Sequence, residues 1–137
     1  MEFTSVNKVF EQAFKKNWER PAISNYQGVT LKFGDVARRM EKLHIMFEEC
    51  GLQKGDKVAL CSRNQANWAV AFLATMTYGA VPVPLLHEFK SSNIHHLVNH
   101  SEAKILFVDE VIWEGLSESE MPDLQAIIQV NTFKLLF

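Results

Sequence analysis

Four short runs of apolar, largely β-branched residues recur at nearly constant spacing, and this pattern constrains the fold more than any other feature. The runs begin at Val58, Val81, Ile105 and Ala126, which are 23, 24 and 21 residues apart. Helical patterns fill the first two intervals. Because parallel strands are joined by crossovers of about a dozen residues or more, this spacing predicts right-handed βαβ units and a parallel sheet. We expect residues 1–137 to form a single, three-layer α/β domain.

The N-terminal segment is predicted to form a helix followed by a β-ribbon. Ser5 can cap this helix, and Pro21 is expected to stop it. Its apolar positions share one face and are Val6, Val9, Phe10, Ala13 and Phe14, with Trp18 near the end. Two short β-leaning runs then flank Gln27-Gly28, where glycine supplies the positive φ of a tight hairpin. The ribbon should lie at the edge of the domain.

A second helix is predicted from Asp35, and Gly51 is placed to end it at the C′ position. One continuous apolar stripe indicates its buried face: Val36, Met40, Leu43, Phe47 and Cys50. The opposite face is charged and expected to be exposed: Arg38, Arg39, Glu41, Lys42, Glu48 and Glu49.

Composition excludes several classes of protein. The chain has 137 residues, of which 47% are hydrophobic and 22% charged, so it can bury a real core and is an ordinary globular sequence. The formal charge is −2 and neither half is basic, which argues against nucleic acid as a partner. No apolar run reaches membrane-spanning length and the N-terminus lacks a signal pattern, so we expect a cytoplasmic protein.

The two cysteines, Cys50 and Cys61, are interpreted as buried, reduced thiols. Cys50 falls near a predicted helix end and Cys61 inside a predicted strand. Neither has the CxxC or histidine spacing of a metal or redox site, and a cytoplasmic chain disfavours a disulfide.

The segment after the first apolar run is a candidate phosphate site. The six glycines never fall into GxGxxG or GxxxxGK spacing, so main-chain N–H groups do not readily converge on a phosphate. Ser62-Arg63-Asn64 could still place an anion at a helix N-terminus. A capping Asn64 meets the same structural need, and we favour this structural interpretation.

Two histidines of the segment 93–100 are candidate metal ligands. His96 and His100 have the i, i+4 spacing that can hold a metal ion from one helix face. No third ligand accompanies them, and Ile94, Leu97 and Val98 define the buried stripe, so these histidines are expected on the surface and no metal site is predicted. No GxSxG motif or paired carboxylate is evident, and no catalytic residue is assigned.

The order of particular segments goes further than periodicity. "LKFGDV" at residues 31–36 is followed by "GLQKGDKVALCSRNQANWAVAFLATMTYGAVPVPL" at 51–85 and "IHHLVNHSEAKILFV" at 94–108. In this order and spacing they resemble the N-terminal region of the adenylate-forming superfamily, the AMP-binding acyl-CoA synthetases. "GDKVALCSRNQANW" and "GAVPVPL" are most similar to the long-chain fatty acid CoA ligases.

This resemblance implies a two-step ligase that uses ATP, Mg²⁺ and CoA. A fatty acid carboxylate attacks the α-phosphate of ATP to give an acyl-adenylate and pyrophosphate, and the CoA thiol then displaces AMP. The family's Ser/Thr/Gly-rich loop ending in Pro-Lys-Gly, its Thr-Glu motif and its ribose-binding Asp are not found in this sequence. We therefore carry over no catalytic or cofactor-binding residue, and expect these 137 residues alone to be inactive and to bind no cofactor.

One loop is a candidate contact by resemblance. Leu86, His87, Glu88 and Phe89 follow "VPVPL" at the carboxyl edge of the predicted sheet, the side where open α/β sheets bind ligands. In short-chain relatives the matching loop lies near CoA, so contact with CoA or with the remainder of the ligase is one interpretation. A plain βα connection is the alternative.

Two hypotheses about function remain. In the first, the chain is the N-terminal fragment of a larger fatty acid CoA ligase, whose partners are the rest of that chain and its substrates; such a parent can lie peripherally on a membrane. In the second, it is a free-standing α/β binding or interaction module without catalysis. The predicted helix 65–78 favours the first, because its large apolar residues cannot all face one small sheet: Trp68, Val70, Phe72, Leu73 and Met76. More chain or self-association should cover the rest.

Overall fold

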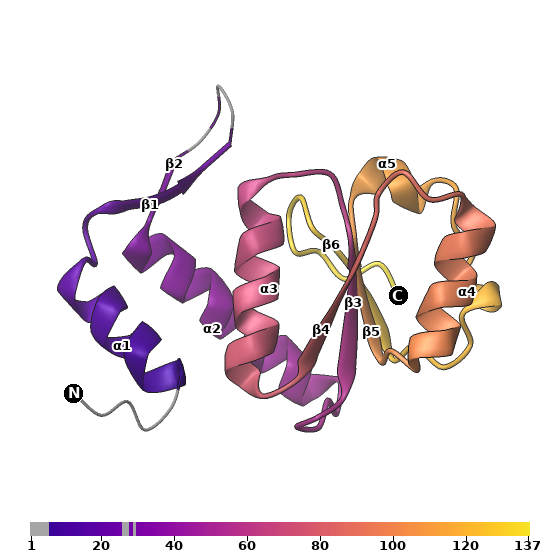
Figure 1. Ribbon diagram of the computed structural model, residues 1–137, viewed down its shortest axis with the longest axis horizontal. Helices are drawn as coiled ribbons and strands as arrows, with labels where there is room; N and C mark the ends of the chain where they lie inside the picture. The colour runs from indigo at the N-terminus through magenta and orange to yellow at the C-terminus, as the bar shows by residue number, and fades with distance from the viewer. Residues whose placement is uncertain (1–5, 26–27, 29) are drawn as a thin grey trace.

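The computed structural model, which describes residues 6–25, 28 and 30–137, consists of a helix and ribbon beside a layered α/β body (Figure 1). Ser5 and Gln27, predicted as a helix cap and a turn residue, lie outside these residues. The helices and strands in chain order are α1 Val6–Lys16, β1 Pro21–Ser24, β2 Thr30–Lys32, α2 Phe33–Glu49, β3 Lys57–Cys61, α3 Ala66–Tyr78, β4 Val81–Leu85, α4 Ser91–Ser101, β5 Ile105–Val108, α5 Glu110–Trp113, the 3₁₀ helix η1 Glu118–Glu120, and β6 Ala126–Gln129.

The four predicted strands form one parallel sheet in the order β4-β3-β5-β6. Val58 of β3 is in register with Pro82 of β4 on one side and with Ile105 of β5 on the other. Both faces of β3 are buried, which explains why a parallel strand reads as a continuous apolar run rather than an alternating one. The prediction of a parallel α/β sheet is confirmed.

Helices cover both faces of the sheet and give three layers (Figure 1). On one face α2 and α3 pack against alternate strand residues, and the rings of Phe47 and Phe107 meet edge to face with centroids 6.0 Å apart. On the other face Ile94 and Val98 of α4 pack against the remaining strand residues together with Met121. Each sheet face therefore has its own apolar core.

Two prolines blunt the outer edge of the sheet at β4. The Val81 N–H donates to the Asp56 carbonyl oxygen at 2.8 Å, toward β3. Since N–H groups along a strand alternate in direction, the nitrogens of Pro82 and Pro84 face outward, where no strand of the described residues pairs with β4. The prolines cost the sheet no hydrogen bond and deny an incoming strand its donors.

The N-terminal helix and ribbon are present as predicted, but the residues at which the helix ends differ from the prediction. β1 and β2 pair antiparallel, with Ile23 opposite Leu31, so the ribbon is confirmed. Pro21 was expected to stop the first helix, yet α1 ends at Lys16 and Pro21 instead begins β1. The side chain of Asn17 donates to the Ala13 carbonyl oxygen at 2.8 Å and satisfies the helix end without a proline.

The second helix starts two residues earlier than expected. Lys32 is the N-cap, and its main-chain N–H donates to the carboxylate of Asp35 at 3.0 Å. Asp35 therefore lies in the first turn of the helix and caps its start. Gly51 follows the helix with φ of 76°, which confirms its predicted C′ role. Arg39 was expected on the exposed face, but it is half-buried and donates to the side-chain oxygen of Asn67 on α3.

Candidate functional site

The candidate site lies at the carboxyl ends of β3 and β5, where the direction of the chain across the sheet reverses. From β3 the chain passes to α3 on one face, and from the neighbouring β5 it passes to α5 on the other. Open parallel sheets bind their ligands in the crevice that such a switch point creates. The loops that begin at Ser62 and Asp109 leave the sheet on either side of this switch point, a position that we call the switch-point crevice.

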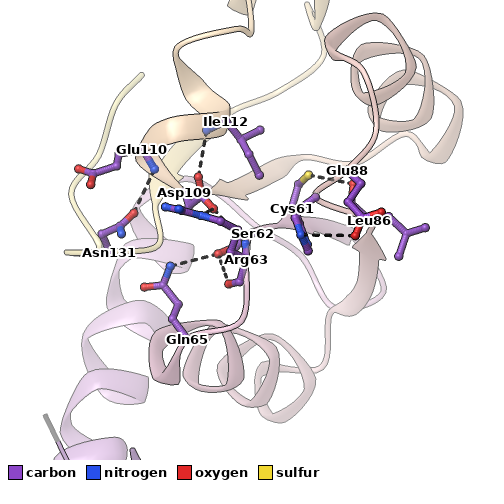
Figure 2. A network of polar contacts seen from close by, with 11 residues as sticks. Cys61, Ser62, Arg63, Gln65, Leu86, Glu88, Asp109, Glu110, Ile112 and Asn131 are labelled. Atoms are coloured by element: carbon purple, nitrogen blue, oxygen red, sulfur yellow. Dashed lines mark hydrogen bonds and ion pairs between the residues drawn. The ribbon is translucent and has the colours of Figure 1, made fainter. Parts of the chain in front are cut away.

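An aspartate of this chain lies at this switch point and is bonded to residues of both loops (Figure 2). The buried carboxylate of Asp109 accepts hydrogen bonds from the main-chain N–H of Arg63 at 2.9 Å and from Arg63 Nε at 3.1 Å. Its second oxygen accepts the N–H of Ile112 at 2.9 Å and so caps α5. The main-chain donor that a phosphate loop would offer is therefore already used by the protein itself.

The electrostatics of Asp109 favour its ionised form in the folded protein. Burial alone raises the pKa of this carboxyl, but the hydrogen bonds from Arg63 and Ile112 and the charge of Arg63 together outweigh burial and hold the pKa below its ordinary value of 3.8. The Arg63 side chain is 53% exposed, so water screens its outer part. The arrangement ties the ends of two neighbouring strands together through a buried carboxylate that is hydrogen-bonded on both oxygens.

The start of α3 corrects the predicted role of Asn64. Asn64 is exposed and Gln65 occupies the N-cap position without a side-chain cap bond. The N–H of Ala66 instead donates to Asn25 Oδ1 at 2.7 Å, from the ribbon 41 residues earlier. Gln65 is extended, with φ of −158°, which displaces Asn64 from the first turn of the helix.

The remaining turn residues at the crevice are bonded to one another (Figure 2). Ser62 Oγ donates to the Arg63 carbonyl oxygen at 2.8 Å and accepts from Gln65 Nε2 at 3.2 Å. On the other side of Asp109, the N–H of Glu110 donates to Asn131 Oδ1 at 3.0 Å and joins the segments that follow β5 and β6. Polar side chains at this edge of the sheet are thus bonded within the protein.

The histidines of α4 do not form a metal centre. His96 and His100 are exposed, with their rings stacked and centroids 5.9 Å apart. His95, which the sequence did not single out, accepts the N–H of Ser117 at its Nε2 at 3.0 Å. In residues 6–25, 28 and 30–137, no three or more His, Cys, Asp or Glu side chains come together in a way that could hold a metal ion.

Comparison with known proteins decides the family. Residues 9–135 match the AMP-binding enzyme family. The chain belongs to this family. The resemblance in the segments 31–36, 51–85 and 94–108 is therefore confirmed over nearly the whole chain.

Relatives of this AMP-binding family member include both peptide synthetases and CoA ligases. It is 25% identical over 108 residues, 79% of its length, to surfactin synthase subunit 2 of Bacillus subtilis, of which it covers 3%. It is 26% identical over 111 residues, 76% of its length, to long-chain-fatty-acid–CoA ligase 6 of Mus musculus, of which it covers 16%. The chain thus spans a small part of the curated relatives it matches.

Solved structures show the same fold. A long-chain-fatty-acid–CoA ligase from Archaeoglobus fulgidus, called FadD1, superposes with a TM-score of 0.80 over 93% of this chain at 24% identity, and the chain covers 27% of that structure. The shared part is the N-terminal subdomain of the adenylate-forming enzymes, and this AMP-binding family member has that architecture.

The loop predicted to touch a ligand lies at the same edge as the crevice. Leu86 is 63% exposed, and Phe89 packs half-buried against the core on the α4 side. His87 Nε2 is 3.8 Å from a carboxylate oxygen of Glu88. The Cys61 thiol lies 3.7 Å from the Leu86 carbonyl oxygen, which places this loop beside the end of β3.

Both cysteines of the family member are free thiols, as predicted, but only Cys61 is buried. Cys50, predicted on the buried stripe, is partly exposed at the C-cap of α2. Burial, followed by the negative charge of Asp109, raises the pKa of the Cys61 thiol to about 11. Burial and then Glu49 raise the pKa of the Cys50 thiol. Thiols with raised pKa are poor nucleophiles, so neither is a catalytic candidate. Within the described part of the chain, none of the helices combines the length and apolarity required to cross a membrane.

Proposed function

We propose that this chain is the N-terminal part of an ATP-dependent long-chain fatty acid CoA ligase, one that joins a fatty acid to CoA through an acyl-adenylate. The observation that carries the proposal is the match of consecutive family segments to consecutive elements: residues 51–85 build β3, α3 and β4, and residues 94–108 build most of α4 and β5. A long-chain ligase is among the relatives. Peptide synthetases are too, so the acid substrate requires a direct test.

In this proposal the chain supplies scaffold and the chemistry lies elsewhere in the protein. The switch-point crevice does not fit a nucleotide phosphate, because Asp109 already holds the main-chain N–H and Nε of Arg63. The sequence also lacks the phosphate loop that ends in Pro-Lys-Gly in this family. The binding of ATP and Mg²⁺ and the reaction with CoA are accordingly assigned to the rest of the ligase, and residues 1–137 to one α/β domain of it.

The loop Leu86, His87, Glu88 and Phe89 is proposed as a contact with CoA or with the remainder of the ligase. Leu86 is a large apolar side chain left exposed at the ligand edge of the sheet, which supports a partner at this position. We assign the ligase to the cytoplasm, where it can also lie peripherally on a membrane.

The test is exchange of labelled pyrophosphate into ATP by the protein translated from the complete reading frame. Palmitate, anthranilate and a mixture of amino acids serve as alternative acids. Exchange that depends on palmitate, followed by thioester formation with CoA, is the expected result. Exchange with amino acids alone would instead make the protein a peptide synthetase. Residues 1–137 alone are expected to give no exchange with any acid.

A second measurement separates this proposal from the free-standing module. Trp68 and Phe72 stack on α3 with centroids 5.4 Å apart, and both remain partly exposed. A ligase fragment should leave such a surface uncovered, so light scattering of residues 1–137 is expected to show self-association as concentration rises. A strictly monomeric, freely soluble chain would favour the module.

A further inference from the structure

A groove between α1 and α2 is lined by apolar side chains and is separate from the switch-point crevice. Phe10, Phe14 and Trp18 line it from α1 and the turn that follows, and Ala37 and Met40 line it from α2. Its volume is about 320 Å³. Small-molecule sites are mostly apolar and start at roughly 300 Å³, so the groove has the size and lining of one. Figure 1 shows α1 and α2 side by side, on the far side of the sheet from α4.

Most polar side chains that line this groove are already bonded within the protein. Asn7 Nδ2 donates to the Thr77 carbonyl oxygen at 2.7 Å. His44 Nε2 lies 3.0 Å from both the Ala74 carbonyl oxygen and Thr77 Oγ1. The Glu11 carboxylate accepts from Lys15 Nζ at 2.8 Å. A guest in the groove would therefore be recognised by its apolar surface rather than by these groups.

One charge on the groove has no partner. Glu41 of α2 is exposed and lines the groove, and the described residues offer its carboxylate neither a hydrogen bond nor an ion pair. Arg38, one turn earlier on the same helix, is paired with Asp35 at 3.2 Å and lies over the Trp18 ring. The lining charges are thus one compensated pair, Glu11 with Lys15, and one uncompensated carboxylate. This balance favours a cationic guest and disfavours an anionic one.

We propose that this groove binds a small apolar amine, an alkyl or arylalkyl ammonium ion. Its hydrocarbon part lies among Phe10, Phe14 and Trp18, and its ammonium group lies at the Glu41 carboxylate. Aromatic rings pack well against hydrocarbon and also attract a nearby cation. The proposal is independent of the ligase function, because a fatty acid is an anion.

The test compares three six-carbon probes that differ in the head group: hexylammonium, hexan-1-ol and hexanoate. Each is titrated into the 137-residue chain while the NMR signals of the Trp18 indole N–H and the Met40 methyl group are followed. Hexylammonium is expected to shift both signals and to bind about fivefold more tightly than hexan-1-ol, the effect of one close charge pair in water. Hexanoate should bind most weakly. Equal binding of hexylammonium and hexanoate, or no shift with any probe, would overturn the proposal.

Three variants locate the site. Glu41→Gln should remove the preference for the amine over the alcohol and leave alcohol binding unchanged. Glu48→Gln, at an exposed glutamate of α2 outside the groove, is the matched control and should change neither. Ala37→Leu should fill the groove and abolish binding of all probes, and circular dichroism would verify that α2 is intact because Leu is a good helix former. Undiminished binding by Ala37→Leu would place the amine elsewhere.

Discussion

The carboxylate of Asp109 binds the main chain and the side chain of Arg63, 46 residues earlier, at 2.9 and 3.1 Å. These two residues follow adjacent parallel strands, so the interaction joins the loops that leave the sheet toward opposite faces. An ion pair with main-chain hydrogen bonds thus closes the place where a sheet of this kind takes a ligand. In this AMP-binding family member the interaction therefore has a structural role: it holds the loops after β3 and β5 together at the switch point.

We expect Asp109→Ala to destabilise the fold by roughly 2 to 4 kcal/mol. The change leaves the main-chain N–H of Arg63 without its acceptor and removes the N-cap of α5. Urea unfolding followed by circular dichroism measures the loss.

Two controls make this expectation specific. Asp123→Ala, at an exposed aspartate, should leave stability nearly unchanged. Arg63→Ala should cost only about 1 kcal/mol, because the main-chain bond persists and the lost guanidinium was half exposed. If Arg63→Ala lowered the free energy of unfolding more than Asp109→Ala, the ion pair of the side chains, not the main-chain hydrogen bond, would be the main source of stability here.

Acid should weaken the fold through the same carboxyl. Burial opposes ionisation of Asp109, but the hydrogen bonds outweigh it and the pKa in the folded state lies below 3.8. A lowered folded-state pKa means that the stabilisation is complete above the unfolded-state pKa and is lost as the pH falls through the folded-state pKa. The free energy of unfolding should therefore fall more steeply between about pH 5 and about pH 2 in the native chain than in Asp109→Asn.

Glu11→Gln provides a comparison for that experiment. The pKa of Glu11 is also lowered, first by its hydrogen bond to Lys15, but this carboxyl is fully exposed. Replacing the Glu11 carboxylate should change the fall of the unfolding free energy at acid pH much less than replacing that of Asp109. Parallel curves for the native chain and Asp109→Asn would refute the assignment.

The sheet was predictable because its signals are local. Strands buried on both faces read as apolar runs, and the helices between them fix the spacing from Val58 to Ala126. Gly51 was likewise predicted from its position alone, since a left-handed residue after a helix favours glycine. Family segments then identified the subdomain.

The hydrogen bonds between distant loops were not predictable, because their partners are far apart in the sequence. Asn25 caps α3 from 41 residues away, and Asp109, at the end of β5, binds Arg63 in the loop after the neighbouring strand β3. Periodicity reports which face a residue takes but not which strands become neighbours. The one available signal was an aspartate directly after the apolar run of β5, where burial demands partners.

Gly34→Ala is expected to destabilise the fold by about 1 to 2 kcal/mol, although alanine is the better helix former. A Cβ atom at Gly34 would lie 2.7 Å from the Trp18 ring, over which the guanidinium of Arg38 also lies. The ring must move for alanine to fit. In a Trp18→Ala background the same change should be neutral or stabilising, so a double-mutant cycle by urea unfolding should give a coupling energy of about 1 kcal/mol or more. Simple additivity would show that the ring is not the obstacle.

Gly79→Val should cost roughly 1 to 2 kcal/mol or more. Gly79 ends α3 with φ of 95°, and its N–H donates to the Met76 carbonyl oxygen at 3.1 Å. A β-branched residue is strained there, whereas the nearest obstacle to a Cβ, the Lys54 side chain, can move. Gly79→Asn should cost less because asparagine tolerates the left-handed region. Equal thermal stability of the Val variant and the native chain would contradict the backbone assignment.

Glu102→Gly should have the opposite sign. Glu102 ends α4 in the position that Gly79 takes on α3, but with φ of 59° in a non-glycine residue. Glycine relieves that strain and should raise stability by roughly 0.5 to 1 kcal/mol, because the removed steric conflict exceeds the added entropy of the unfolded chain. Glu48→Gly in the last turns of α2 is the matched control and should lower stability by about 1 kcal/mol, since there glycine relieves no strain. Thermal unfolding measures both, and a loss of stability in Glu102→Gly would mean that Glu102 stabilises the end of α4 by more than its backbone strain costs.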